Sequence, residues 1–117
     1  MIRGTVVRGE GKGKGLGYPT ANINVSVAST KLSPGIYASF AILRNQSYLA
    51  ALVIHEVLDK IEVFFMDYQG PDFYGEEIAV EAVQRLSALE RLDTEEERKE
   101  KIENDVELVR EFFAEKG

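Results

Sequence analysis

A glycine-rich segment near the start of the chain has the composition of an anion-binding loop. Over residues 9–17 every second residue is glycine, which places five of the ten glycines here, with Lys12 and Lys14 between them. The order of residues matches neither a P-loop, which needs Ser or Thr directly after Gly-Lys, nor a dinucleotide fingerprint. Bare backbone amides can approach a phosphate closely, and lysines can neutralise it. The alternative interpretation is a hairpin loop whose glycines occupy left-handed positions.

Glu62 is the second candidate for chemistry. It is the only charged residue in the otherwise apolar run 61–66. A carboxylate in a buried strand costs free energy unless it is paired or used, and desolvation favours its protonated form. Such a group suits a general base that takes a proton from an alcohol. The alternative is a strand-end carboxylate that turns to solvent beside Lys60, while His55 is expected to have a structural or surface role without a recognisable partner.

The length and composition limit what these residues can form. With 117 residues and 44% hydrophobic content, the chain has the size of one compact domain with one core. It contains no cysteine and one histidine. These counts exclude disulfides, thiolate zinc sites, cysteine nucleophiles and multi-histidine metal centres.

The charge and the hydropathy pattern restrict the partners. A net charge of -6 argues against nucleic acid or an anionic membrane surface as a partner. The start of the chain lacks the pattern of a signal peptide, and no window approaches the roughly 20 apolar residues that span a bilayer. We therefore expect a cytoplasmic protein. No protein partner is evident, so a monomer is expected.

Short strand patterns separated by turn residues fill most of the chain. Strands are expected over residues 2–8, 19–25, 36–43, 47–54, 60–67 and 77–86. A turn at 44–46 would join two of them into a hairpin, and residues 26–33 are expected to form a polar connector. Many short strands at close spacing predict an antiparallel barrel or sandwich.

The end of the chain has the pattern of an amphipathic helix over about residues 94–115. Thr94 followed by Glu97 forms a capping box at its start. Apolar residues recur at helical spacing and form one stripe, which consists of Ile102, Val106, Val109 and Phe113. This stripe is expected to pack on the strands, and the many acidic residues to form the solvated face.

The motifs and their order resemble those of the riboflavin kinase family, including the kinase modules of bifunctional FAD synthetases. The glycine-rich segment continues into Leu-Gly-Tyr-Pro-Thr-Ala-Asn at residues 16–22, which matches the family motif throughout. Further similar motifs are Pro-Gly-Ile-Tyr at 34–37, Glu-Val-Phe-Phe-Met-Asp-Tyr at 62–68 and Asp-Phe-Tyr-Gly-Glu at 72–76. The resemblance spans nearly the whole chain.

The resemblance implies a mainly β fold, a small closed antiparallel Greek-key barrel of about six strands with a C-terminal amphipathic helix packed on it. The barrel would comprise about residues 1–88 of a single riboflavin-kinase-like domain, 1–117. A second domain is not expected, so an adenylyltransferase half that converts FMN to FAD would be absent.

The implied activity is transfer of the γ-phosphoryl group of ATP to the terminal ribityl hydroxyl of riboflavin, which gives ADP and FMN. Mg2+ is the implied cofactor, held by Thr20 and Asn22. These side chains face the same way because they lie two residues apart in an extended segment, and neutral oxygens suit a magnesium ion that keeps water and phosphate ligands. The alternative is that both side chains satisfy turn backbone after Pro19. Glu62 is the implied general base.

The remaining site residues are implied to bind the nucleotide. This group consists of Gly9, Gly11, Gly13, Lys14 and Thr20. Lys12 occupies the neighbouring basic position, and loop solubility is the alternative role for both lysines. Phe73 and Tyr74 are candidates for lining the flavin or nucleotide site, with core packing as an equal alternative.

Two departures from the family pattern concern the part expected to contact the flavin. The loop before Glu62 is missing or shortened to residues 53–59, and Ser87 and Leu92 stand where the family usually has an arginine and an aromatic residue. Two alternatives to a riboflavin kinase follow. One is a kinase of the same fold with another alcohol as substrate, and the other is a catalytically silent flavin- or nucleotide-binding regulatory module.

Overall fold

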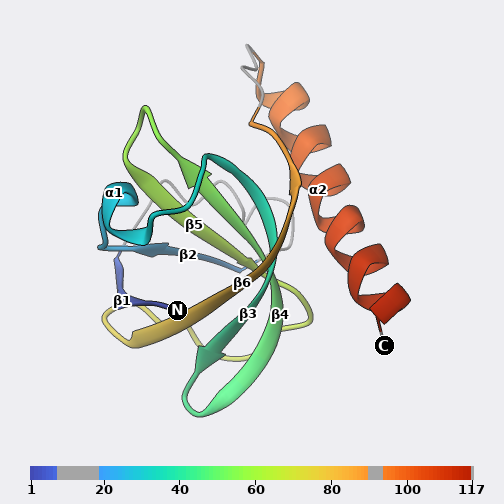
Figure 1. The fold of residues 1–117 in the computed structure, drawn as a ribbon. Helices are drawn as coiled ribbons and strands as arrows, with labels where there is room; N and C mark the ends of the chain where they lie inside the picture. Colours follow the sequence, from blue (N-terminus) through green and yellow to red (C-terminus); the bar gives the residue numbers. More distant parts are fainter. Residues whose placement is uncertain (8–18, 90–93, 117) are drawn as a thin grey trace.

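The structure is a computed structural model that describes residues 1–7, 19–89 and 94–116. Within them, antiparallel strands close into a barrel in the order β1-β2-β5-β4-β3-β6 (Figure 1). The strands are β1 (Ile2–Val7), β2 (Thr20–Ile23), β3 (Gly35–Leu43), β4 (Gln46–His55), β5 (Lys60–Phe65) and β6 (Glu77–Ser87). Because β6 pairs with β3 after the β3-β4-β5 meander, the topology is a Greek key. The predicted closed barrel is confirmed.

Alternating residues of each strand point into the barrel and away from it. On β5, Ile61, Val63 and Phe65 belong to the interior core. Phe64 lies between them in sequence and joins a second apolar cluster outside the barrel, which contains Val106 of the C-terminal helix. Since side chains alternate between the two faces of a strand, these clusters identify the inner and outer face of every strand.

The C-terminal helix, α2 (Glu95–Lys116), lies along one side of the barrel and packs on β3, β4 and β6 (Figure 1). Val106 and Val109 are buried, and Ile102 and Phe113 pack against the same outer cluster, which confirms the predicted stripe. The helix begins as the capping box predicts, since the Glu97 amide donates to Thr94 Oγ1 at 3.1 Å. No helix in the described ranges is long and apolar enough to span a membrane.

A polar cluster on α2 also fastens the helix to the barrel. Lys101 Nζ donates to Ser87 Oγ at 2.8 Å and to Asp105 Oδ1 at 2.7 Å. The Asp105 residue is only 6% exposed. The apolar stripe and the hydrogen bond from Lys101 to Ser87 of β6 therefore act together to hold α2 on the outer face.

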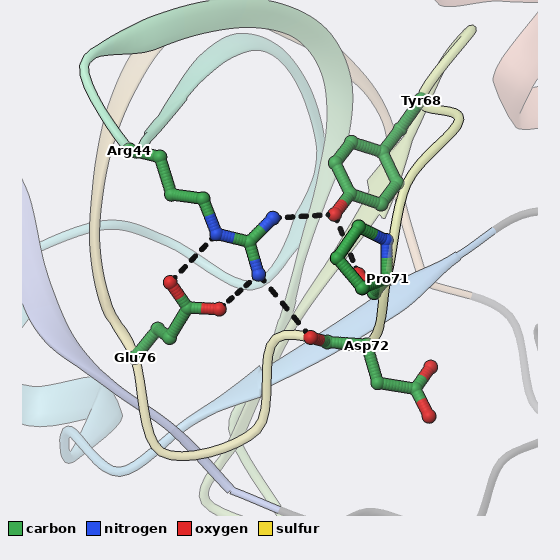
Figure 2. A network of polar contacts seen from close by, with 5 residues as sticks. All are labelled: Arg44, Tyr68, Pro71, Asp72 and Glu76. Atoms are coloured by element: carbon green, nitrogen blue, oxygen red, sulfur yellow. Dashed lines mark hydrogen bonds and ion pairs between the residues drawn. The ribbon is translucent and has the colours of Figure 1, made fainter.

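A second polar cluster, the turn network, ties the β3–β4 turn to the β5–β6 connection (Figure 2). Arg44 and Asn45 form this turn with φ of 51° and 65°, as a tight hairpin requires. The Arg44 guanidinium binds the Glu76 carboxylate with two nitrogens, the Tyr68 hydroxyl at 2.9 Å and the Asp72 carbonyl at 3.2 Å. The hydrogen bonds to Glu76 and Tyr68 raise the pKa of Arg44 above its ordinary value. The Arg44 guanidinium therefore keeps its positive charge.

The connector between β2 and β3 is more ordered than expected. It contains one turn of helix, α1 (Val27–Thr30), whose N-cap is Ser26. The Val27 amide donates to Asp59 Oδ1 at 2.8 Å. Because Asp59 lies in the β4–β5 turn, this bond joins the connector to the tip of that hairpin.

Candidate active site

The predicted metal ligands and the predicted base lie on neighbouring strands. Asn22 is paired with Val7 of β1 on one side and with Glu62 of β5 on the other. Directly opposed residues of an antiparallel pair have Cβ atoms about 5 Å apart and side chains on the same face. The folded chain therefore brings the Asn22 amide and the Glu62 carboxylate side by side.

The side chains of Thr20, Asn22 and Glu62 all point away from the barrel interior. Ala21 and Ile23, which flank Asn22, belong to the interior core, so that Asn22 and Thr20 face outward. Glu62 faces outward for the same reason, between Ile61 and Val63. Thr20 pairs with Phe64, two residues along β5 from Glu62. The candidate site is consequently on the outer wall formed by β2 and β5.

Asn22 contains a buried oxygen that no group in the described part of the chain satisfies. Asn22 is 8% exposed, and its Oδ1 is buried without a hydrogen-bond partner among these residues. A buried acceptor in this state costs free energy, so it requires an explanation such as a bound ion. Thr20, 7% exposed on the same face, supplies a second neutral oxygen. This donor set fits Mg2+, which prefers oxygen ligands and keeps several waters.

The part of the chain that the structure describes has no cluster of the carboxylate and imidazole side chains that commonly bind metals. There, no group of three or more His, Asp and Glu side chains has the arrangement of a metal site. Thr20 and Asn22 thus remain the candidates for a cation that is also held by nucleotide phosphates.

Glu62 has a partner that the sequence did not reveal. His55 Nε2 lies 2.8 Å from Glu62 Oε1, and their side chains are 26% and 16% exposed. Lys60 Nζ lies 3.9 Å from the same oxygen. The expectation that His55 has no partner is wrong. The contact between His55 and Glu62 results from the register of the β4–β5 hairpin. This register pairs Val53 with Glu62 and so places His55 diagonally beside the carboxylate.

A small pocket of about 160 Å³ opens next to this pair. Its lining residues are Pro34, His55, Glu56, Val57, Leu58 and Leu89. Val57, at the tip of the β4–β5 hairpin, is 97% exposed. The short hairpin that departs from the family pattern therefore contributes an apolar wall close to Glu62.

The other predicted residues lie in two further places. The segment with Gly9, Gly11, Gly13, Lys12 and Lys14, like Leu92, lies outside the described residues. Phe73 is 4% exposed and stacks against Phe65 with a centroid distance of 5.1 Å, and Tyr74 is partly buried beside Phe73 at 6.4 Å. Core packing, the alternative given for Phe73, accounts for its contacts.

Ser87 belongs to the same outer row as the candidate site. The row runs Asn22, Glu62, Val53, Ile36 and Ser87 across five strands. Ser87 accepts a hydrogen bond from Lys101 of α2. Lys101 therefore lies beside the position at which the family usually has an arginine, and its charge is paired with Asp105.

The fold and then the family follow from comparison with known proteins. The crystal structure of riboflavin kinase from Trypanosoma brucei matches 96% of this chain and 75% of its own, with a TM-score of 0.70 and 21% identity, which establishes a common fold. The family model described as flavokinase, riboflavin kinase, matches residues 1–113. The chain belongs to the riboflavin kinase family, and the resemblance seen in its motifs is confirmed.

Three further matches are two curated proteins and one solved structure. The RNA-binding riboflavin kinase RibR of Bacillus subtilis is 30% identical over 97% of this chain, and the trifunctional protein RibF/MnmA of Mycoplasmoides gallisepticum is 30% identical over 96%. The chain spans about half the length of the first, 51%, and 18% of the second. A macrolide-efflux protein structure from Streptococcus pneumoniae also matches, with a TM-score of 0.70 and 25% identity over 92% of this chain and 35% of that one.

Proposed function

We propose that the chain is an ATP-dependent riboflavin kinase that converts riboflavin to FMN in the presence of Mg2+. The observation that carries this proposal is the pairing of Asn22 with Glu62 on the outer wall of the barrel. A phosphoryl-transfer site needs a place for the nucleotide phosphates and, within reach of it, a base for the acceptor alcohol. Asn22 on β2 is proposed to serve the nucleotide phosphates through Mg2+, and Glu62 on β5 to serve as the base.

Glu62 is the proposed general base. As the oxygen of the terminal ribityl hydroxyl forms a bond to the γ-phosphorus, its proton moves to the Glu62 carboxylate. The bond between the γ-phosphorus and the β–γ bridging oxygen breaks, and ADP leaves with that oxygen. Partial burial of the side chain, 16% exposed, limits competition from water for the same proton.

Thr20 and Asn22 are the proposed protein ligands of Mg2+, and the unsatisfied Asn22 Oδ1 is the observation that supports them. When bound with ATP, the ion neutralises phosphate charge and orients the γ-phosphoryl group. Gly9, Gly11, Gly13 and Lys14 are proposed, on their composition and the family motif, to bind the phosphates through backbone amides and one cation.

The acceptor site is the part in which this chain differs most from the family pattern. The pocket beside His55 has a volume of about 160 Å³, and ligand pockets are commonly about 300 Å³ or larger. A flavin ring would therefore not fit within this pocket alone. The short hairpin and Ser87 also favour a second candidate function, a kinase of this fold for a smaller alcohol.

The ligands, the oligomeric state and the location in the cell are also part of the proposal. The proposed ligands are ATP, ADP, riboflavin and FMN, bound by a single kinase domain that works as a cytoplasmic monomer. RNA binding is in the name of the Bacillus subtilis relative, of which this chain covers about half. A net charge of -6 disfavours a polyanion, so nucleic acid is not proposed as a ligand here.

Product analysis tests this function directly. Purified protein incubated with Mg-ATP and riboflavin should form FMN and ADP in equal amounts, as measured by chromatography. A parallel screen of other sugar alcohols and nucleosides tests the second candidate. Phosphorylation of another alcohol without FMN would replace riboflavin as the substrate, and the absence of any phosphoryl transfer, with ligand binding retained, would support the silent module instead.

A further inference from the structure

The contact between His55 and Glu62 places a second ionisable group at the proposed base. The 2.8 Å distance from His55 Nε2 to Glu62 Oε1 is that of a strong hydrogen bond. Lys60 Nζ, at 3.9 Å from the same oxygen, is too far to form one. Within the described part of the chain, Glu62 Oε1 therefore takes its hydrogen bond from the histidine.

The position of the proton in this contact follows from the chemistry of the two groups. An ionised carboxylate only accepts hydrogen bonds, so the hydrogen must be on His55 Nε2. One lone pair of Oε1 is then directed at the imidazole, which makes Oε2 the better acceptor for a proton from a substrate. The histidine in this way selects which carboxylate oxygen acts as the base.

The elements that hold the pair are rigid. His55 is the last residue of β4 and pairs with Lys60, the first residue of β5, two residues from Glu62. The hairpin tip is in turn fixed by the bond from the Val27 amide to Asp59 Oδ1. Groups on paired strands hold their geometry better than groups on loops, so His55 has the support that a positioning group needs.

We propose that His55 is a positioning residue for the phosphoryl-transfer reaction, which orients the Glu62 carboxylate by a hydrogen bond from Nε2 to Oε1. The inference rests on the proposed kinase function. Without this bond, the carboxylate samples several rotamers, of which a fraction points Oε2 at the acceptor hydroxyl. Misplacement of a reacting group by about 1 Å can lower a rate about 100-fold.

Kinetic variants test the role of the hydrogen bond. We expect His55→Leu to lower kcat by about 10- to 100-fold with little change in the KM for ATP, because nucleotide binding does not involve the imidazole. His55→Gln retains an N–H donor and should recover most of this loss. Lys60→Met removes the more distant cation and should have a much smaller effect on kcat than His55→Leu. A kcat of His55→Leu equal to wild type, or no recovery in His55→Gln, would overturn the inference.

A double-mutant cycle separates positioning from a general structural effect. Glu62→Asp shortens the side chain by one methylene, so the carboxylate no longer reaches His55. Adding His55→Leu to Glu62→Asp should then lower kcat by no more than about twofold, since the shared interaction is already lost. Equal losses from His55→Leu in both backgrounds would show that His55 acts independently of Glu62. Thermal unfolding of each variant serves as the control for folding.

An independent measurement does not require activity. In a long-range 15N–1H spectrum of the wild-type protein, the imidazole should carry a proton on Nε2, and the signal should change in Glu62→Gln. A neutral ring protonated only on Nδ1 would contradict the inference even in an active kinase. Wild-type protein that shows the expected imidazole signals but transfers no phosphoryl group would contradict the proposed function alone.

Discussion

Two polar regions of the barrel differ in how completely their groups satisfy one another. In the turn network, the donors of Arg44 bind Glu76, Tyr68 and the Asp72 carbonyl, and the Tyr68 hydroxyl itself donates to the Pro71 carbonyl (Figure 2). On the outer wall of β2 and β5, by contrast, Asn22 Oδ1 is buried without a partner among the residues that the structure describes.

Under the proposed function, the difference separates groups that hold the fold from a group that binds a ligand. A network with its hydrogen bonds made contributes to stability. A buried acceptor without one lowers it, and such a cost persists where function requires the group. We therefore expect substitutions in the turn network to act on stability, and substitutions on the outer wall to act on activity.

The largest effect is expected at Glu62. Glu62→Gln keeps the size of the side chain but cannot accept a proton as a carboxylate does, so kcat for FMN formation should fall about 10²- to 10⁴-fold. Binding of Mg-ADP, measured by calorimetry, should remain. Glu81→Gln, which removes one exposed carboxylate from β6, is the matched control. Wild-type turnover by Glu62→Gln would remove this residue from the mechanism.

The partly buried polar cluster of Lys101, Ser87 and Asp105 should resemble the turn network and affect stability. Lys101→Met removes the cation that binds Asp105 and Ser87, and loss of hydrogen bonds made by a charged group costs about 1.5–3 kcal/mol. The free energy of unfolding, from urea denaturation, should fall by this amount. Lys99→Met, on the exposed face of α2, should change it by less than about 0.5 kcal/mol. Equal effects would show that the Lys101 cluster does not hold the helix.

Asn22→Leu tests at a single position whether a residue of the outer wall affects activity or stability. Loss of a proposed Mg2+ ligand should reduce the apparent Mg2+ affinity in the kinase assay at least about 10-fold. The unfolding midpoint should stay equal to that of the wild type or rise, since a buried oxygen without a partner is removed. A lower midpoint with an unchanged Mg2+ titration would reverse the assignment and make Asn22 a structural residue.

The smallest effect on turnover is expected for Arg44→Met. The β5–β6 connection loses its attachment to the β3–β4 turn, so limited proteolysis within residues 66–76 should become faster and the unfolding midpoint should fall. FMN formation should stay within about twofold of the wild type, because Arg44 touches neither Asn22 nor Glu62. A large loss of kcat with an unchanged midpoint would contradict the division between the two regions.

Local signals were sufficient to predict most elements. The stripe of Ile102 and Val106 has the period of a helix, and helical residues contact neighbours three and four positions away, so the pattern is readable from the chain. The single helical turn within the connector at 26–33 was not predicted, because one turn of helix has no period to detect. Gly35 begins β3 with a φ of 149°, and a Cβ added there would lie 2.6 Å from Arg85 Nε, so the need for glycine depends on a strand distant in sequence.

The amino-acid sequence by itself determined which groups are available for chemistry and, through its ordered motifs, the family to which the chain belongs. The tertiary structure decided which of these groups meet. Thr20 and Asn22 share a face because side chains alternate along a strand, which a sequence displays. That Asn22 faces Glu62, and that His55 binds Glu62, depends on the register between strands, and a shift of one residue would send these side chains to opposite faces.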